Sequence, residues 1–414
     1  MTGRSLPDSP PARLIKVVHV TAIDASLRAF LLPLLVTLKR AGFDLRAACS
    51  PGLPIAELDA AAIPVQRIPI ARRIAPLGDL LSIWRLFRYF RREKIDLVHA
   101  HTPKAGLLAR LAARLAGVPI IVYTVHGFYF HDHMPWLPRH FHIFLEKVGA
   151  RCCRILLPVS SEDVRTATAL NIAPPEKVRY LGGGIDIDRF RPGRFSADEI
   201  RRRRAEFNIP PDAVVVGIVA RMVREKGYLE LFQALAGLMP KFPKLYLLQI
   251  GGTDREKADA LGPDSAKPYG ISDRSRLLGD RSDVPDLLLL MDILVLPSYR
   301  EGLPVSLMEA AASGLPIVST RIRGCREVVA DGENGLLVPP RDAAALAAAL
   351  EKLIAAPQLR IQMGEAGRSR AVEHYDQRRV CRTTLETYRD LLLERRLQPP
   401  PGLQTQLDLL PAAK

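Results

Sequence analysis

The sequence has no long apolar run and no signal segment. None of its stretches reaches the roughly 18 consecutive apolar residues that a transmembrane helix needs, and residues 1–13 lack the apolar segment of a secretory signal. The longest apolar stretches, residues 30–36 and 287–297, predict a buried helix and a buried strand. We therefore expect a cytoplasmic protein.

Cysteine is scarce and lacks metal-binding spacing. The 5 cysteines are odd in number, and the adjacent pair Cys152–Cys153 is not a zinc knuckle. Buried thiols in a reducing compartment account for them best. The histidine pairs in His131–His133 and His140–His142 have no third ligand at useful spacing, so we expect loop or surface histidines and no metal.

Acidic residues are outnumbered by basic ones, and aromatic residues are few. The formal net charge is +15, which favours nucleic acid, an anionic membrane surface or phosphorylated substrates as partners. Aromatic residues make up 6% of the chain, which argues against a nucleic-acid module with exposed rings. A basic polyanion-binding module stays as an alternative, but the sequence predicts no nucleic-acid partner.

Strand-like segments alternate with helical segments in two series. The segments expected as strands are residues 14–20, 44–50, 97–101, 120–125, 156–160, and then 213–220, 245–251, 276–278, 293–296, 317–319 and 335–338. This alternation predicts α/β architecture with parallel sheets. Two series predict two facing Rossmann-like domains, with a central cleft at the carboxyl ends of their strands.

A polar, proline-punctuated and basic stretch, residues 190–211, separates the two series. We therefore predict a first domain over residues 1–190 and a second over residues 191–375. The proline-rich end, residues 398–414, predicts a flexible tail.

Glu301 and Glu309 lie in the most informative segment of the chain. The apolar strand 291–297 is followed by a turn at Glu301 and a helix that opens near Pro304, where proline is favoured. The N–H groups that would point out of this helix N-terminus, a ready phosphate site, are those of Gly302, Leu303, Val305 and Ser306. One carboxylate can then reach a sugar and the other a ribose, with a diphosphate between them. The alternative is a dipole-favoured first-turn acid and a solvated helix residue.

This segment resembles the signature of retaining nucleotide-sugar glycosyltransferases of family 4, which have the GT-B fold. The E-x7-E spacing of Glu301 and Glu309 matches. The resemblance extends over residues 14–395 and is carried most specifically by Leu278–Arg281, Asp292–Ser298, Gly314–Val318, Gly324–Glu327 and Gly335–Pro340. It implies that the first domain binds the acceptor and the second the donor, with a helix over residues 376–397 returning to the first.

Arg221 and Lys226 follow the strand 213–220. A departing diphosphate needs positive charge where negative charge develops, and the positions match the family's donor-diphosphate ligands. Arg224 between them is expected to be solvated. The resemblance implies a leaving group stabilised by side chains and a helix N-terminus, so we predict no cofactor and no metal.

Further site residues follow from the resemblance. His126 corresponds to the histidine that lies against the transferred sugar, and Gly279 and Arg281 are expected to line the base pocket. His101 and Lys104 are weaker candidates for the acceptor, Lys104 through an acceptor phosphate.

The chain departs from the family pattern at two places. Gly183 replaces the asparagine of an interdomain loop, which puts that side chain's role in doubt. Residues 21–26 replace a Gly-Gly loop. With Arg28, they resemble a branch that assembles surface polysaccharides and lipid-linked oligosaccharides and typically uses UDP-activated N-acetylhexosamines or related sugars.

A basic stretch, residues 80–93, combines four arginines with Trp84, Phe87 and Phe90. It can be an amphipathic helix on an anionic membrane surface, peripheral on the inner face, which would suit a lipid-diphosphate-saccharide acceptor. It can equally be a domain helix with its aromatic rings in the core. The sequence leaves both open.

The sequence thus predicts a retaining transferase that moves a hexose or N-acetylhexosamine from a nucleotide-diphosphate sugar, UDP-linked, to a glycan or lipid-linked saccharide. Domain closure would bring His126 over the anomeric carbon, and the departing phosphate oxygen would be the base. A UDP-sugar 2-epimerase of the same fold is the alternative enzyme, which the E-x7-E and Arg/Lys pattern argues against.

Overall fold

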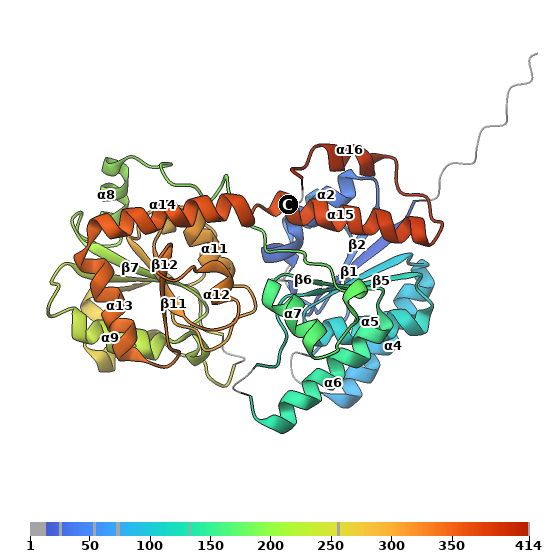
Figure 1. The fold of residues 1–414 in the computed structure, drawn as a ribbon, viewed down its shortest axis with the longest axis horizontal. Coiled ribbons are helices and arrows are strands. Elements are labelled where there is room, and N and C mark those ends of the chain that lie inside the picture. The colour runs from blue at the N-terminus through green and yellow to red at the C-terminus, as the bar shows by residue number, and fades with distance from the viewer. Residues whose placement is uncertain are drawn as a thin grey trace, which may run out of the picture. The chain divides into compact units, whose positions relative to one another are not determined.

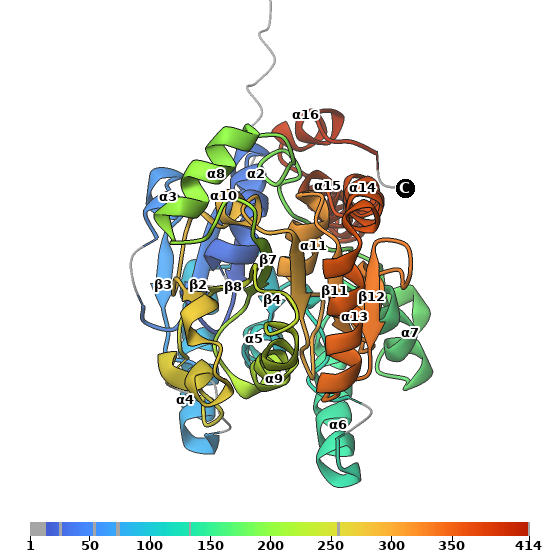
Figure 2. The same ribbon diagram turned by 90° about the vertical axis from the view of Figure 1, so that its left-hand side faces the viewer.

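The computed structural model describes residues 14–24, 27–52, 55–71, 75–131, 134–254 and 257–412, which form two compact units. Unit 1 contains the described residues up to Val159, those from 163 to 181, and those from Arg378 onward. Unit 2 contains residues 160–162 and 182–377. Figures 1 and 2 show the ribbon from two directions.

Unit 1 is built on a six-stranded parallel sheet with the order β3-β2-β1-β4-β5-β6. Helices α4, α5 and α6 cover one face, and α2 and α15 cover the other (Figure 1). The element bounds are β1 Lys16–Val20, a π-helix Leu27–Leu31, α2 Leu32–Arg40, β2 Asp44–Cys49, α3 Ala56–Ala60, β3 Val65–Arg67, α4 Pro76–Glu93, β4 Leu97–His101, α5 Pro103–Ala116, β5 Ile120–Val125, α6 Trp136–Cys152, β6 Ile155–Pro158, α7 Ser161–Ala169, a 3-10 turn Pro175–Lys177, α15 Gln377–Glu394 and α16 Gly402–Asp408.

Unit 2 repeats the architecture with the order β12-β11-β10-β7-β8-β9. Helices α9 and α13 cover one face, and α8, α11 and α14 the other (Figure 1). The element bounds are α8 Ala197–Glu206, β7 Val214–Val219, η3 Arg224–Lys226, α9 Tyr228–Leu238, β8 Leu245–Ile250, 3-10 turns Pro263–Tyr269 and Ser272–Arg274, β9 Ser275–Leu277, α10 Val284–Leu288, β10 Ile293–Leu296, α11 Val305–Ala312, β11 Ile317–Thr320, α12 Cys325–Val328, β12 Gly335–Val338, α13 Ala343–Ala355 and α14 Pro357–His374.

Both sheets reverse their strand order once, and open sheets of this kind commonly bind ligands at such a point. The reversal lies between β1 and β4 in unit 1 and between β7 and β10 in unit 2. In open parallel sheets the loops diverge beyond the carboxyl ends of such strands and leave space for a ligand. The strands are apolar because helices bury both of their faces.

The structure differs from the sequence-based prediction in three elements. Helix α6 was not expected; His140 and His142 lie on it, and His140 is exposed, in agreement with the surface alternative. The three-residue strand β3 was not expected either. Residues 402–408, within the segment expected as a flexible tail, form α16, whose Leu403 and Leu407 are buried.

Candidate functional site

Unit 2 brings the loops after β7 and β10 together at its switch point. Helical turn η3 follows β7, and Gly227 ends it with a left-handed φ of 75°. A Cβ at Gly227 would collide with the carbonyl of Pro297. Glycine is therefore needed for η3 to lie directly against the chain that leaves β10.

Lys226 and Glu301 meet in this contact. Lys226 Nζ lies 2.5 Å from Glu301 Oε1, and both side chains are largely buried. Ser298 Oγ donates a second hydrogen bond to the same oxygen at 2.7 Å. The structure thus joins the predicted diphosphate ligand to the predicted sugar ligand and adds Ser298, which the sequence analysis did not single out.

Helix α11 begins beside this pair, as the sequence predicts. Pro304 precedes its first residue, Val305, and the first N–H groups of a helix have no intrahelical acceptor. Gly324, with φ of 80°, packs so closely on the carbonyl of Gly302 that a Cβ would not fit. The loop before α11 is therefore held between two glycine contacts, with the positive end of the helix dipole beside Glu301.

Glu309 lies in α11 and is half-buried, so it is not the solvated helix residue of the alternative interpretation. Desolvation raises the pKa of Glu309 to about 8, and nearby Arg189 opposes the shift. The carboxyl group is therefore mainly protonated at neutral pH and can both donate to and accept from hydroxyl groups.

Arg221 is exposed and forms an ion pair with Asp254, in the loop after β8. Gly251, the residue after β8, has φ of 131°, and a Cβ there would collide with the carbonyl of Ala220, the residue after β7. The loops after β7 and β8 are therefore in close backbone contact. The role of Arg221 as a diphosphate ligand stays a prediction.

Gly279 and Arg281 follow β9. The carbonyl of Gly279 accepts the N–H of Gly251 at 2.8 Å, and Gly279 itself has φ of 67°. Arg281 is bound by both oxygens of Asp283, at 2.8 and 2.6 Å. The backbone of Gly279 is thus part of the loop contact, whereas the guanidinium of Arg281 is occupied at the surface.

The space beside Gly183 is filled by neighbouring side chains. A Cβ at this position would lie 2.3 Å from Leu303 Cδ2 and 2.8 Å from Met308 Sδ, so the ends of these side chains would have to shift. Leu303 fills the space into which the family's asparagine would project.

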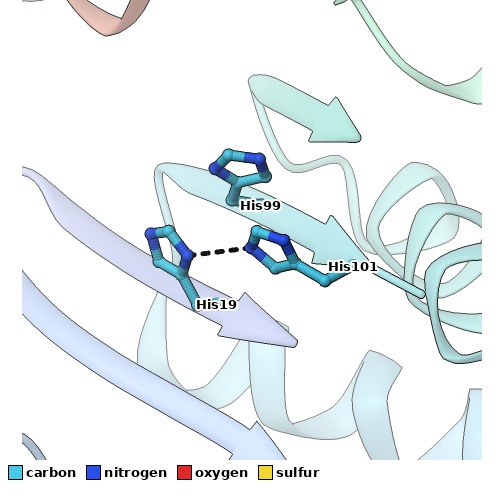
Figure 3. A group of neighbouring side chains, drawn as sticks. All are labelled: His19, His99 and His101. Carbon is cyan, nitrogen blue, oxygen red and sulfur yellow. Dashed lines mark hydrogen bonds between the residues drawn. The ribbon is translucent and has the colours of Figure 1, made fainter. Parts of the chain in front are cut away.

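Unit 1 gathers buried histidines at its switch point. His19 on β1 and His99 on β4 are register partners, and His101 lies two residues further on the same face of β4. Figure 3 shows the three rings together, with His19 Nδ1 3.0 Å from His101 Nε2. His101 Nδ1 lies 3.1 Å from Nε2 of the half-buried His126. The structure thus connects two predicted site residues, His101 and His126, and adds His19 and His99.

His19, His99 and His101 are also the one group among the described residues whose ligand atoms could surround a metal ion. The sequence analysis did not consider this group, because its residues come from two strands. Their ring nitrogens, however, face other nitrogen and hydroxyl groups at hydrogen-bond distance. The absence of a metal stays a prediction.

Lys104 is the second residue of α5 and forms an ion pair of 2.6 Å with Asp79 of α4. Thr102, which precedes the first residue of α5, has φ of 62° and ψ of 148°, a region that non-glycine residues avoid. Its buried hydroxyl oxygen has no hydrogen-bond partner among the described residues. A strained, unsatisfied threonine and a lysine thus stand at a helix N-terminus next to His101.

Helix α4 has features of both interpretations of residues 80–93, because one of its aromatic rings is buried and another is exposed. Phe90 is buried in the core, whereas Trp84 is 50% exposed, with Arg88 over its ring. Helix α6 has a second exposed apolar face, formed by Trp136, Leu137, Phe141 and Phe144. Within the part of the chain that the structure describes, no helix could span a bilayer.

Both units match families of sugar-transferring enzymes. Residues 199–370 match the family described as Glycosyl transferases group 1. Residues 27–184 match the Glycosyl transferase 4-like domain.

Individual relatives agree with the family match. EpsD of Bacillus subtilis (strain 168) is 31% identical over 371 residues, which cover 88% of this chain and 94% of EpsD. The UDP-Gal:alpha-D-GlcNAc-diphosphoundecaprenol alpha-1,3-galactosyltransferase of Escherichia coli is 28% identical over 338 residues, 79% of this chain and 85% of the relative. HepE of Anabaena, solved in complex with UDP and glucose, is similar in fold, with a TM-score of 0.73, 20% identity and coverage of 90% of this chain and 99% of HepE.

These matches extend over both units and most of the length of each relative. Two parallel sheets with a Rossmann-type strand order, and structural neighbours of the same build, give the GT-B fold. The chain therefore belongs to the group 1 glycosyltransferases and is an enzyme that transfers glycosyl groups.

Proposed function

We propose that the chain is a retaining glycosyltransferase that moves a hexose or N-acetylhexosamine from a UDP-sugar to a lipid-diphosphate-linked saccharide. The observation that carries the donor half is the contact between Lys226 and Glu301 at the N-terminus of α11. One cation, one carboxylate and a set of free N–H groups are thereby collected at the switch point of unit 2.

Each group has a distinct part in this proposal. Lys226, Arg221 and the N–H groups of α11 hold the diphosphate and stabilise its charge as it leaves. Glu309 binds the ribose hydroxyls, and Glu301 binds sugar hydroxyls through the oxygen that faces neither Lys226 nor Ser298.

The remaining parts of the proposal concern the nucleotide base and the reacting sugar. The backbone at Gly279 lines the pocket for the nucleotide base, and Arg281 contacts the base when its ion pair with Asp283 opens. His126 contacts the transferred sugar, and the departing phosphate oxygen takes the proton of the attacking hydroxyl.

The acceptor proposal rests on unit 1. Lys104, the N-terminus of α5 and the unsatisfied hydroxyl of Thr102 are groups that bind phosphate oxygens. The E. coli relative acts, by its name, on a diphosphoundecaprenol acceptor. A lipid diphosphate is therefore the acceptor group that we propose.

Nucleotide release tests the donor site. Purified protein is incubated with UDP-, GDP- and ADP-sugars, with and without undecaprenyl-diphosphate-sugar acceptors and EDTA. We expect release from one UDP-sugar, unaffected by EDTA, and loss of about 100-fold or more in Glu301→Ala and Lys226→Ala because each removes a charge from the transition-state contact. Arg224→Ala is the matched control, since Arg224 is an exposed cation of the same turn.

Three results would contradict the proposal. Full release in Lys226→Ala would remove the donor site from its proposed place. A UDP-sugar recovered with inverted C2 and without release would favour the epimerase. No nucleotide binding, with salt-sensitive RNA binding that Glu309→Ala leaves unchanged, would favour the polyanion-binding module.

We further propose that unit 1 rests on an anionic membrane surface, where a lipid-linked acceptor is found. Arg85, Arg88 and Arg91 of α4 form no ion pair within the described residues. They line a groove of about 630 Å³ beside β3. Leu77 and Trp84 of the same helix are 85% and 50% exposed. Unpaired arginines next to exposed apolar side chains match a lipid interface.

The chain's 2 tryptophans give a direct test, because Trp84 and Trp136 both lie on the exposed faces of α4 and α6. We expect a blue shift of tryptophan fluorescence with vesicles that contain phosphatidylglycerol and none with phosphatidylcholine alone. Replacing Arg85, Arg88 and Arg91 by alanine should remove it. The control replaces residues 201–203 of α8, which changes the net charge equally. Equal loss in both variants would contradict the proposed surface.

A further inference from the structure

The buried histidines of unit 1 form one continuous hydrogen-bonded chain, here called the histidine chain. Its members, in order of contact, are Thr124, His99, Tyr388, His19, His101 and His126. The five contacts measure 2.7, 2.8, 3.1, 3.0 and 3.1 Å in the same order. It starts on β5, passes through β4, α15, β1 and β4 again, and ends at His126, the residue that follows β5.

All members except His126 are buried, and this keeps the rings neutral. Desolvation lowers the pKa of His19 to about 3 and that of His126 to about 4. It lowers the pKa of His99 and His101 well below the usual value. A neutral imidazole has one N–H donor and one nitrogen acceptor. Each ring in the chain must therefore accept at one nitrogen and donate at the other.

The contact at Thr124, the buried end of the histidine chain, determines which group donates in each hydrogen bond. Thr124 Oγ1 has no other hydrogen-bond partner among the described residues than His99 Nε2. If His99 donated, the buried hydroxyl hydrogen of Thr124 would have no acceptor, which is costly. Thr124 therefore donates to His99 Nε2, and His99 donates from Nδ1 to the oxygen of Tyr388.

The direction then passes along the chain to its half-buried end. Within the described residues, the Tyr388 hydroxyl forms hydrogen bonds with these two imidazole rings alone, so it donates to His19 Nε2. His19 donates from Nδ1 to His101 Nε2, and His101 donates from Nδ1 to His126 Nε2. The lone pair of His126 Nε2 is thereby occupied, and its proton must lie on Nδ1.

We propose that the histidine chain fixes the tautomer of His126: its proton is held on Nδ1, and its Nε2, which accepts from His101, cannot act as a base. The inference rests on the proposed function only for its meaning in catalysis. It makes Tyr388, His19 and His101 positioning residues, and it agrees with a mechanism in which the departing phosphate oxygen accepts the proton.

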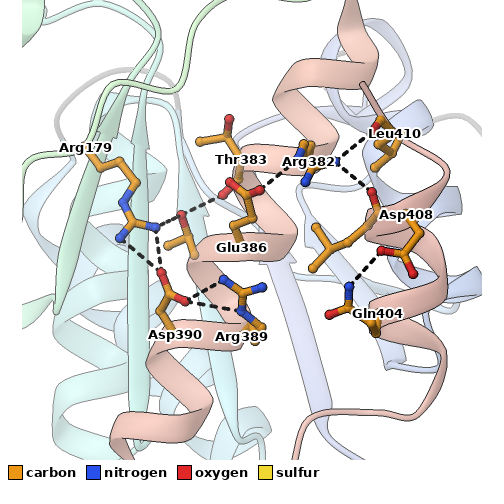
Figure 4. Close-up of polar contacts among 11 residues, drawn as sticks. Arg179, Arg382, Thr383, Glu386, Arg389, Asp390, Gln404, Asp408 and Leu410 are labelled. Carbon is orange, nitrogen blue, oxygen red and sulfur yellow. Dashed lines mark hydrogen bonds and ion pairs between the residues drawn. The ribbon is translucent and has the colours of Figure 1, made fainter. Parts of the chain in front are cut away.

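Tyr388 can have this role because α15 is fixed on unit 1. Arg179 donates to Thr387 at 3.0 Å and to Asp390 at 3.2 Å (Figure 4). Arg382 donates to the carbonyls of Leu407 and Leu410 at 2.8 and 2.7 Å and so joins α15 to the end of α16. Helix α15, which supplies Tyr388, is thus held by polar contacts of residues before and after Tyr388.

The tautomers can be read without any substrate. In protein labelled with ¹⁵N-histidine, long-range proton–nitrogen correlation spectra distinguish Nδ1–H from Nε2–H, and a His126→Gln variant assigns the signals. We expect Nδ1–H at His126, His101, His19 and His99. Nε2–H at His126 would overturn the inference. So would one equivalent of Zn²⁺ bound through these rings, because a ligating nitrogen cannot also take part in the chain.

Two variants test the direction from different links. Tyr388→Phe removes the central hydroxyl, and Thr124→Val removes the terminal donor. In each variant one ring nitrogen has no partner, whichever way the remaining hydrogen bonds are donated. We therefore expect a mixture of both tautomers at His126. Tyr123→Phe is the control, since it removes a buried hydroxyl of the same unit outside the chain. An unchanged single tautomer in both test variants would overturn the inference.

Kinetics separates positioning from general damage. Tyr388→Phe should lower kcat about 10-fold, roughly the effect of one buried hydrogen bond, and leave KM for the donor nearly unchanged. An equal loss in Tyr123→Phe would overturn the positioning role. If no transferase activity is found at all, the spectra still decide the tautomer, so failure of the proposed function and failure of this inference can be distinguished.

Discussion

Lys226 and Glu301 are joined by a 2.5 Å ion pair between side chains that are only 15% and 11% exposed. They are 75 residues apart in sequence, and each follows a strand next to the reversal point of the same sheet. The pair neutralises two charges that the proposed reaction needs separately. Donor binding must therefore redistribute these contacts, with the diphosphate taking part of the lysine and a sugar hydroxyl part of the carboxylate.

A double-mutant cycle separates the structural from the chemical role of this pair. Lys226→Met and Glu301→Gln should each lower the free energy of unfolding by about 1–3 kcal/mol, because each leaves a largely buried group without its partner. The double variant should be less destabilised than the sum of the two. Nucleotide release should stay lost in all three. Additive destabilisation in urea titrations would show that the contact contributes no coupling energy.

Glu309 should make stability fall as pH rises. Its pKa is raised to about 8 in the folded protein, whereas an unfolded glutamate titrates near its usual value, so between these values the folded state binds more protons. The stabilising effect is complete below the unfolded pKa and is lost as pH rises through about 8. Glu309→Gln should therefore gain about 4 kcal/mol relative to the parent between pH 5 and 8.5.

Urea titrations at the two pH values measure this gain. Exposed Glu333 provides the control variant Glu333→Gln, for which the two stability curves should run parallel. Parallel curves for Glu309→Gln as well would mean that Glu309 is solvated. Glu309→Ala should weaken UDP binding, because the proposed ribose contact loses the group that donates to and accepts from the hydroxyls.

Much of unit 2 could be predicted because its site is local in sequence. Glu301, Pro304 and Glu309 lie on one strand–turn–helix segment, and the helix begins beside Pro304 as expected. Arg221 and Lys226 could be predicted to lie near this segment because parallel strands end at the same sheet edge. The pairing of Lys226 with Glu301, and of Arg221 with Asp254, depends on loop packing that no local pattern describes.

The histidine chain of unit 1 could not be predicted in this way. His99 and His101 alternate on β4 and hint at a shared face, but His19 joins them only through the register of β1 with β4. Tyr388 lies 289 residues after His99 in the sequence, and no local sequence pattern indicates that it joins the histidines. Helix α6 was missed because Trp136, Phe141 and Phe144 are apolar yet exposed, which blurs the helical period on which the prediction depends.

Helix α6 is held by a buried ion pair. Arg110 Nη2 of α5 lies 3.1 Å from Glu146 Oε2, and both groups are buried. The guanidinium stacks on the ring of Tyr123, 3.7 Å from its centroid. Glu146→Leu should lower the free energy of unfolding by about 3–5 kcal/mol, because it leaves a buried charge unpaired.

Adding Arg110→Met should recover much of this loss, since the two replacements together form an apolar contact. Arg151→Ala, on the exposed side of α6, should change stability by less than about 0.5 kcal/mol. Urea titrations of the four proteins measure the cycle. If Glu146→Leu were as stable as Arg151→Ala, the pair would not be what fixes α6.

Gly183 tests whether the departure from the family pattern is compensated nearby. Leu303 and Met308 occupy the space that a side chain at this position would need, and Leu303 stands in the loop whose N–H groups we assign to the diphosphate. Gly183→Asn should therefore cost about 1–3 kcal/mol of unfolding free energy through overpacking. It should lower nucleotide release as well, because the loop before α11 is displaced.

Leu303→Ala in the same protein should restore most of the stability by making room for the asparagine. Denaturation and release assays on the single and double variants measure both effects. If Gly183→Asn were as stable as the parent, Leu303 would move aside without cost. Packing would then not explain why glycine stands at position 183.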